Sequence, residues 1–401
     1  MTHAESTGAA GLDVCPIMPT YGPPSIMFVR GSGTELWDRD GKRYLDLLTG
    51  LAVTSLGHCH PAVAEAISEQ ARTLLHVSNL YATEPQVEVA QTIDRLNGGG
   101  GQVFFCNSGA EANEAAIKLA RKHGGRGRHV VVSALRSFHG RTLATLHATG
   151  QPEKHEIFQP LPEGFRHVPY GDVDELERTL DPSIAGILLE AVQGEGGVNP
   201  ATKEYFQEVR RICTERGILM MVDEVQTGLA RTGEWFGYQH FDVRPDVVSM
   251  AKALGNGMPI GAVWAPREIA ASFEPGDHAT TFGGQPLATS AARAVLRTME
   301  AMDAPSAAQR IGGELMAKLE QTTGVSEVRG MGLLLAAELH DGIDARVAVA
   351  KCIAGGLVVN AVTPTAIRFA PPFTLTSEQI DEALGILSTA IAETIAEAGE
   401  S

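Results

Sequence analysis

Residues 203–228 read KEYFQEVRRICTERGILMMVDEVQTG and carry the pattern that decides the fold. They predict a helix at Lys203–Arg216, followed almost at once by a strand at Ile218–Val222. The strand is apolar throughout, and runs without polar alternation are typical of parallel strands that are covered on both faces. Asp223 follows the strand directly. The segment therefore predicts one helix–strand unit of an α/β sheet, with a carboxylate at the end of a buried strand.

The same alternation of helices and short apolar strands extends over much of the chain. Further helices are predicted at Pro61–Leu75, Glu84–Leu96, Glu111–His123 and Val173–Leu180. Start signals of the capping-box type are formed by Thr83 with Gln86, Ser108 with Glu111, and Asp172 with Glu175. Further strands are predicted at Val103–Cys106, His129–Ser133, Gly186–Leu189, Val247–Met250 and Ala262–Trp264. This order predicts a mostly parallel central sheet, and such sheets bind ligands at the carboxyl ends of their strands.

The two ends of the chain follow a different pattern. Near the N-terminus, Thr34–Trp37 and Lys42–Asp46 flank a turn and predict a hairpin. From Pro286 onward, two long helices precede a glycine-interrupted apolar stretch and a last helix at Ser377–Ala396, which indicates a smaller α+β domain. We therefore expect an N-terminal segment, 1–60, that packs with the small domain, a large α/β domain, 61–285, and a small C-terminal domain, 286–401.

Composition and local patterns argue against several classes of protein. The net charge of −16 over 401 residues gives no sign of the basic face of a nucleic-acid binder. No apolar stretch of about 18 residues and no signal-peptide pattern are present, so a cytoplasmic protein without a membrane span is expected. The five cysteines are widely spaced and lack a CxxC pair, which argues against a disulfide framework. Because the neighbouring residues His58-Cys59-His60 cannot easily bind one tetrahedral ion, no metal site is expected.

Two predicted strands end in turns that could bind a ligand. Val103–Cys106 is followed by Asn107-Ser108-Gly109-Ala110-Glu111, where the start of a helix could hold a phosphate. A plain capped helix is the alternative. His129–Ser133 is followed by a cluster in which Phe138 could stack on a flat ring and Arg141 could bind a carboxylate. Alternatively, Phe138 belongs to the core and Arg141 to the surface.

Two further strands end in charged residues. Asp223 ends an apolar strand, where a carboxylate is costly unless it is paired, for example with a protonated pyridine nitrogen. A turn cap or a metal ligand are the alternatives. Lys252 stands between Ala251 and Ala253 at the start of a glycine-rich turn, and a buried lysine of lowered pKa is a nucleophile of the Schiff-base type. A lysine that extends to the surface is the alternative. Together the four strand ends supply the parts of a pyridoxal-phosphate (PLP) site.

The sequence resembles the class III aminotransferases of the fold-type I PLP enzymes, and among them the acetylornithine aminotransferases most. The resemblance runs from about Tyr21 to Ile386. Its motifs include Asn107-Ser108-Gly109-Ala110-Glu111, Phe138-His139-Gly140-Arg141-Thr142, Gln193-Gly194-Glu195-Gly196-Gly197, Asp223-Glu224-Val225-Gln226-Thr227-Gly228, Lys252-Ala253-Leu254-Gly255, Thr280-Thr281-Phe282 and Ile367-Arg368-Phe369.

The resemblance implies a role in cofactor or substrate binding for several residues of these motifs and for Tyr21. Those expected to contact the cofactor are Ser108, Gly109 and Ala110 at the phosphate, Phe138 on the ring with His139 beside it, Asp223 at the pyridine nitrogen, Val225 and Gln226 at the ring and its phenolic oxygen, and Lys252 as the covalent attachment. Thr281 would reach the phosphate of the neighbouring subunit of a homodimer. Those expected to contact substrate are Tyr21, Arg141 at the distal carboxylate, Arg368 at the α-carboxylate of glutamate or 2-oxoglutarate, and Glu195, which would mask Arg368 when the other substrate is bound.

The function that the resemblance implies is amino transfer in arginine biosynthesis. The δ-amino group of N2-acetylornithine would pass to 2-oxoglutarate, with N-acetylglutamate 5-semialdehyde and glutamate as products and Lys252 as general base and acid. Rival donors are ornithine, succinylornithine, N-succinyl-diaminopimelate and 4-aminobutyrate, because the charges of the site suit them all. A PLP enzyme of another reaction class and a non-catalytic binding protein on the same fold are further alternatives.

Overall fold

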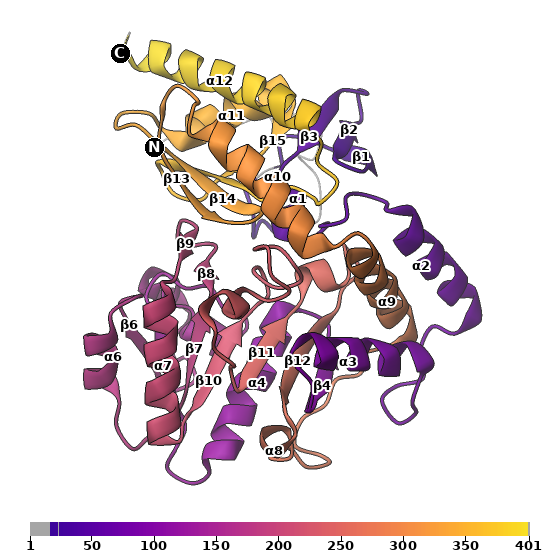
Figure 1. Ribbon diagram of the computed structural model, residues 1–401, viewed down its shortest axis with the longest axis vertical. Coiled ribbons are helices and arrows are strands. Elements are labelled where there is room, and N and C mark those ends of the chain that lie inside the picture. Colours follow the sequence, from indigo (N-terminus) through magenta and orange to yellow (C-terminus); the bar gives the residue numbers. More distant parts are fainter. Residues whose placement is uncertain (1–16, 23, 400–401) are drawn as a thin grey trace.

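A seven-stranded sheet forms the centre of the larger part of the molecule (Figure 1). The computed structural model describes residues 17–22 and 24–399. Along the sheet the strands are β4 (Gly101–Cys106), β12 (Gly261–Pro266), β11 (Val247–Met250), β10 (Leu219–Asp223), β7 (Ile184–Glu190), β5 (Val130–Ala134) and β6 (Phe165–Val168). Only β12 runs against its neighbours, since it pairs antiparallel with both β11 and β4. The prediction of a mostly parallel α/β sheet is confirmed.

The strands are apolar throughout because side chains cover both faces of the sheet. On β10, Leu219 and Met221 pack in one cluster with helix α4 (Gly109–Gly124), whereas Met220 and Val222 pack in another with helix α7 (Lys203–Arg216). Two features of the sheet were not predicted. Burial cannot reveal the direction of β12, and the edge strand β6 was missed because its sequence, Phe-Arg-His-Val, contains two polar residues.

The predicted helices of the large domain are present, but one of their three caps is not. The remaining ones are α2 (Pro61–Thr73), α3 (Glu84–Leu96) and α6 (Val173–Thr179). Ser108 Oγ accepts from the Glu111 amide at 3.2 Å, and Asp172 caps α6 in the same way. The capping prediction for Thr83 is wrong: its hydroxyl makes no cap, and Gln86 donates to Asn79 Oδ1 at 2.8 Å instead.

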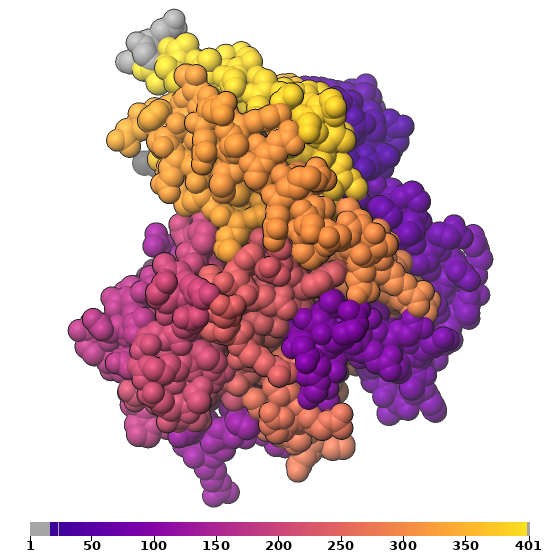
Figure 2. Space-filling model, in the orientation of Figure 1, coloured from indigo at the N-terminus to yellow at the C-terminus, as the bar shows by residue number. Residues whose placement is uncertain are grey.

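The C-terminal residues build a second, smaller sheet. Its strands are β13 (Val325–Met331), β14 (Leu334–Leu339), β17 (Ala366–Phe369) and β16 (Asn360–Ala361), and the helices beside it are α10 (Ala304–Leu319), α11 (Ala345–Gly355) and α12 (Ser377–Gly399). The N-terminal strands β1 (Phe28–Ser32), β2 (Glu35–Asp38) and β3 (Arg43–Asp46) join this part, because β3 pairs with β15 (Leu357–Val358). Figure 2 shows the C-terminal residues packed directly over the larger part.

The division at residues 60 and 285 stays a proposal. The pairing of β3 with β15 supports the association of the N-terminal segment with the small domain. In contrast, α9 (Pro286–Ala301), the first helix beyond the proposed boundary, packs on α2 and α3 (Figure 1). Short elements complete the fold: α1 (Thr49–Ala52), α5 (Leu143–Ala148), α8 (Arg267–Ala270), β8 (Val192–Gln193), β9 (Asn199–Pro200), η1 (Pro152–Lys154), η2 (Glu156–Phe158), η3 (Gly237–Phe241) and η4 (Lys252–Leu254). None of the described helices is long and apolar enough to cross a membrane.

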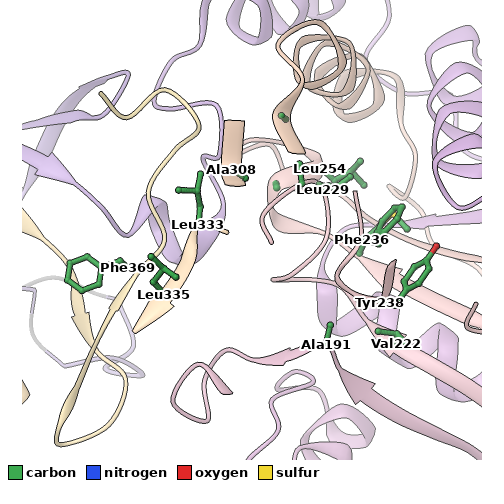
Figure 3. Packing of buried hydrophobic residues seen from close by; sticks show 14 of the residues in the cluster. Ala191, Val222, Leu229, Phe236, Tyr238, Leu254, Ala308, Leu333, Leu335 and Phe369 are labelled. Atoms are coloured by element: carbon green, nitrogen blue, oxygen red, sulfur yellow. The ribbon is translucent and has the colours of Figure 1, made fainter. Parts of the chain in front are cut away.

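One continuous hydrophobic cluster connects the two sheets. Figure 3 shows Val222 and Phe236 on the side of the large sheet, and Leu335 and Phe369 on the side of the small one, with Leu254 and Leu229 between them. Because these side chains pack as one cluster, we expect the two parts to unfold together.

Truncation of Leu335 should therefore destabilise the whole chain. This side chain is fully buried on β14, and Leu335→Ala should lower the free energy of unfolding in urea by about 2–5 kcal/mol. The matched control is Val347→Ala on α11, where the side chain is 40% exposed and the expected change is within about 0.5 kcal/mol. Equal losses for the two variants would contradict this account.

Candidate active site

A cavity of about 380 Å³ opens at the carboxyl ends of β4, β5, β7, β10 and β11. The predicted site residues that line it are Ser108, Gly109, Ala110, Phe138, His139, Arg141, Glu195, Asp223, Val225, Gln226 and Lys252. Parallel strands deliver their following residues to one edge, so segments more than a hundred residues apart meet there. Among residues 17–22 and 24–399, no group of His, Cys, Asp or Glu side chains is arranged to hold a metal ion.

Asp223 is held by donors from three segments. Its Oδ2 accepts from Asn113 Nδ2 at 2.7 Å and lies 2.8 Å from His139 Nδ1, while its Oδ1 accepts from the Val225 amide at 3.0 Å. Asn113 is itself oriented by Ser249, whose hydroxyl donates to Asn113 Oδ1 at 2.6 Å. With only 4% of its surface exposed, Asp223 is a fixed buried carboxylate that can stabilise a cation in the cavity.

Lys252 follows β11 after one residue, Ala251, in a backbone conformation that residues other than glycine rarely adopt. Its φ is 44°, in the left-handed region, which costs about 1–3 kcal/mol and is often found at functional sites. Burial lowers the pKa of its amine to about 8, and the nearby Arg368 acts in the same direction, whereas Glu195 and Asp223 oppose the shift. About a tenth of the amine is therefore neutral and nucleophilic at pH 7, and about half at pH 8.

The start of α4 forms an anion cradle against Val225. Ser108, Gly109 and Ala110 line the cavity at the N-terminus of this 16-residue helix, where free amides and the helix dipole favour an anion. A Cβ on Gly109 would lie 2.7 Å from Val225 Cγ1, so only glycine permits this approach. The predicted phosphate site therefore fits the backbone.

The two predicted arginines differ in exposure and pairing. Arg141 is exposed at the cavity, with its guanidinium carbon 5.5 Å from the centre of the Phe138 ring. Arg368 is 1% exposed on β17, and its Nη1 lies 2.6 Å from Glu195 Oε1 and 3.1 Å from the Gly194 carbonyl oxygen. Its Nη2 is buried without a partner among the described residues. Burial alone would raise the pKa of Glu195, but Arg368 outweighs this effect and the net shift is downward.

Three predicted residues do not line the cavity of the single chain. Arg368 is buried behind it and reaches it through its contact with Glu195. Thr281 is exposed, and Tyr21 is 89% exposed.

Two further residues of the cavity have no role in the sequence prediction. Asn113 orients Asp223, and Glu190 ends β7 opposite Asp223 in the strand register. Glu190 Oε2 accepts from the Phe138 amide at 3.2 Å. Burial raises the pKa of Glu190 well above its usual value, and the charge of Asp223 adds to the shift. The signal that identified Asp223, a carboxylate at the end of an apolar strand, was also present at Glu190.

The raised pKa of Glu190 predicts a pH dependence of stability. Folded Glu190 keeps its proton to a higher pH than the unfolded chain, where the pKa is 4.5, so folding takes up a proton. The free energy of unfolding of the wild type should then fall as the pH rises above this value, by at most about 1.4 kcal/mol per pH unit. Glu190→Gln removes this contribution, so its stability relative to the wild type should increase as the pH rises above about 4.5.

Urea unfolding at several pH values tests this expectation. The matched control is Glu153→Gln, because Glu153 is exposed and should show no such trend. A constant stability difference between Glu190→Gln and the wild type over the whole range would refute the buried neutral carboxyl.

Comparison with known proteins places the chain in one family. The family described as Aminotransferase class-III matches residues 17–391. The acetylornithine aminotransferase of Caldanaerobacter subterraneus is 49% identical over 388 residues, which cover 94% of this chain and 97% of the relative. That of Methanocaldococcus jannaschii is 44% identical and covers 93% and 95%.

Solved structures agree. The ornithine aminotransferase from Toxoplasma gondii, described with PLP at partial occupancy in its active site, superposes with a TM-score of 0.90 at 31% identity, over 96% of this chain and 94% of the other. A transaminase from Virgibacillus reaches 0.91 at 28% identity, over 96% and 98%. The α/β architecture is thus that of the fold-type I PLP enzymes, and the chain belongs to the class-III aminotransferases.

Proposed function

We propose that this protein transfers the δ-amino group of N2-acetylornithine to 2-oxoglutarate, with PLP as cofactor, and yields N-acetylglutamate 5-semialdehyde and glutamate. The observation that carries the proposal is the pairing of Arg368 with Glu195 while Arg141 is free at the cavity. Relatives that are 44–49% identical over almost their whole length are acetylornithine aminotransferases, which supports the same donor. The place in arginine biosynthesis follows from this reaction, and the cytoplasmic location stays a prediction.

The residues of the cavity fit the cofactor group by group. Ser108, Gly109 and Ala110 would hold its phosphate. Phe138 and Val225 would contact its ring, with His139 beside it and Gln226 at the phenolic oxygen. Asp223 would pair with the ring nitrogen, and Lys252 would bind it covalently. The buried Nε2 of His139 has no partner among the described residues, so it is free to bond a ligand. At Gly109 the backbone comes so close to Val225 that no side chain would fit, and this leaves the amides at the start of the helix accessible to a phosphate.

When bound, PLP supplies an electron sink next to the carbon that loses its proton. The chain supplies the proton transfer. Burial lowers the pKa of Lys252 to about 8, so about half of the amine is neutral at that pH. The neutral amine can take the proton from the substrate carbon as a general base, and the ammonium group that forms can return the proton as a general acid. Asn113 and His139 hold the Asp223 carboxyl group in place, so that it would stabilise a protonated ring nitrogen when the cofactor is bound.

One switch would let the cavity accept two donors of different shape. N2-acetylornithine carries its carboxylate far from the reacting amine, where Arg141 can bind it in bidentate fashion. Glu195 meanwhile neutralises Arg368. Glutamate brings a second carboxylate beside the reacting amine, so Glu195 must withdraw, and Arg368 already offers an unpaired Nη2 in this region.

A donor screen tests the reaction. With 2-oxoglutarate, acetylornithine should release glutamate with a kcat/KM roughly tenfold or more above that of ornithine or 4-aminobutyrate. Lys252→Ala should lose roughly 10³-fold in kcat, whereas Lys203→Ala, at an exposed lysine, should retain it. If acetylornithine is no better than 4-aminobutyrate, the donor is wrong, and undiminished turnover in Lys252→Ala would refute the mechanism.

We further propose a homodimer with shared active sites. Thr281 is exposed, and beside it the apolar ring of Phe282 is exposed to solvent in the single chain. Tyr21, Leu80 and Tyr81 are large exposed side chains as well, and burial of exposed apolar side chains would favour an interface. Thr281 would then reach the phosphate held by the partner.

Sedimentation equilibrium tests the dimer. The particle mass should be twice the chain mass of 42.5 kDa. Phe282→Glu should shift it toward the monomer, because burying a carboxylate in an apolar interface is costly. Val347→Glu, at an exposed site on α11, should leave the mass unchanged, and a monomeric wild type would exclude shared sites.

A further inference from the structure

A second cation lies near Arg141, close to the ring of the cavity residue Phe138. Lys154 ends the short helix η1, and its Nζ is 5.9 Å from the centre of the Phe138 ring. The guanidinium carbon of Arg141 lies 5.5 Å from the same ring centre. Burial lowers the pKa of Lys154, and the positive charge of Arg141 lowers it further. The positive charges of Lys154 and Arg141 therefore repel each other, and both lie near the Phe138 ring, which lines the cavity.

Neither cation is neutralised. No carboxylate lies within salt-bridge distance of Lys154 or Arg141 in the part of the chain that the structure describes, although lysines such as Lys122 and Lys318 have such partners. In a chain with a net charge of −16, an unpaired pair of cations is unexpected. The nearby Glu195 carboxylate is already paired with Arg368.

The position of Lys154 is maintained by a neutral partner. Its ammonium group donates to Gln151 Oε1, and Gln151 Nε2 donates to the Ser137 carbonyl oxygen at 2.8 Å. Ser137 immediately precedes Phe138, so the lysine is tied to the loop that forms the cavity wall. Lys154 is half-buried, and Gln151 therefore holds its ammonium group close to the Phe138 ring and to Arg141, the residue expected to bind the distal carboxylate of a donor.

We propose that Lys154 is a specificity-determining residue, which together with Arg141 forms a pair of cations that selects N2-acylated donors over donors with a free α-amino group. The inference rests on the proposed function and extends it. The distal end of N2-acetylornithine carries one carboxylate and a neutral amide, whereas that of ornithine carries a carboxylate and an ammonium group. Two uncompensated cations attract the first and repel the ammonium of the second.

The test compares the two donors in holoenzyme variants. Lys154→Gln should lower kcat/KM for acetylornithine by about 3- to 10-fold, mainly through KM, because a partly exposed charge that contributes to binding is removed. It should leave ornithine unchanged or improve it, so the ratio of the two kcat/KM values falls. Lys154→Glu should lower the ratio further. Lys154→Arg, which keeps the charge, should preserve it, and Lys203→Gln is the matched control on the surface.

The outcomes are distinct. A ratio that is the same in Lys154→Gln and the wild type overturns the inference, and so does an equal loss in Lys154→Arg, since shape and not charge would then matter. These results leave the proposed function intact, because the wild type still converts acetylornithine. A wild type that does not convert acetylornithine overturns both. Thermal unfolding of each variant identifies folding defects. If Lys154→Gln is defective, the comparison of the kcat/KM ratios of Lys154→Arg and Lys154→Glu still measures the effect of charge.

Discussion

The buried carboxylate of Asp223 is the point on which the candidate active site depends. A charge at the end of the apolar strand β10 is stable only if donors surround it. Asn113, His139 and the amide of Val225 are those donors, and each belongs to a different segment. The cost of an unpaired Asp223 therefore holds α4, the loop after β5 and the turn after β10 in one arrangement, and with them the anion cradle and the ring of Phe138.

Two adjacent buried carboxyl groups at the strand ends, Asp223 and Glu190, differ in their hydrogen-bond donors, since Asp223 has three and Glu190 accepts from the Phe138 amide. Glu190 stands opposite Asp223 in the register, and two adjacent carboxylates in a dry site cannot both ionise without great cost. Burial and the charge of Asp223 raise the pKa of Glu190, which therefore keeps its proton. Lys252 loses part of its charge for the same reason, since burial lowers the pKa of the amine. Burial thus shifts both groups toward their neutral forms in the same cavity.

Sequence patterns predicted the sheet well because burial on both faces leaves a direct mark on the strands. They could not give the direction of β12, since an antiparallel strand buried on both faces has the same composition. Asp223 and Lys252 stood out as charges in apolar surroundings, whereas Asn113 lies inside a helix, where only its contacts reveal its role. Glu190 was identifiable by the rule that found Asp223. Arg368 could be placed only through the family resemblance, because its strand belongs to the other sheet.

The cations near the cavity differ in whether a carboxylate of the chain is paired with them, and this difference bears on which substrates could bind. Arg368 spans from the small sheet to the large part of the molecule, where Glu195 and the Gly194 carbonyl oxygen hold it, so its use by a substrate requires a carboxylate that competes with Glu195. Arg141 and Lys154 have no carboxylate within salt-bridge distance among the described residues. In the proposed reaction, Arg141 would therefore bind a distal carboxylate without displacing an internal partner, whereas a carboxylate next to the reacting amine would have to displace Glu195 from Arg368. On this account the distal end of the donor would be recognised in the same way in both half-reactions, and the proximal end would distinguish them.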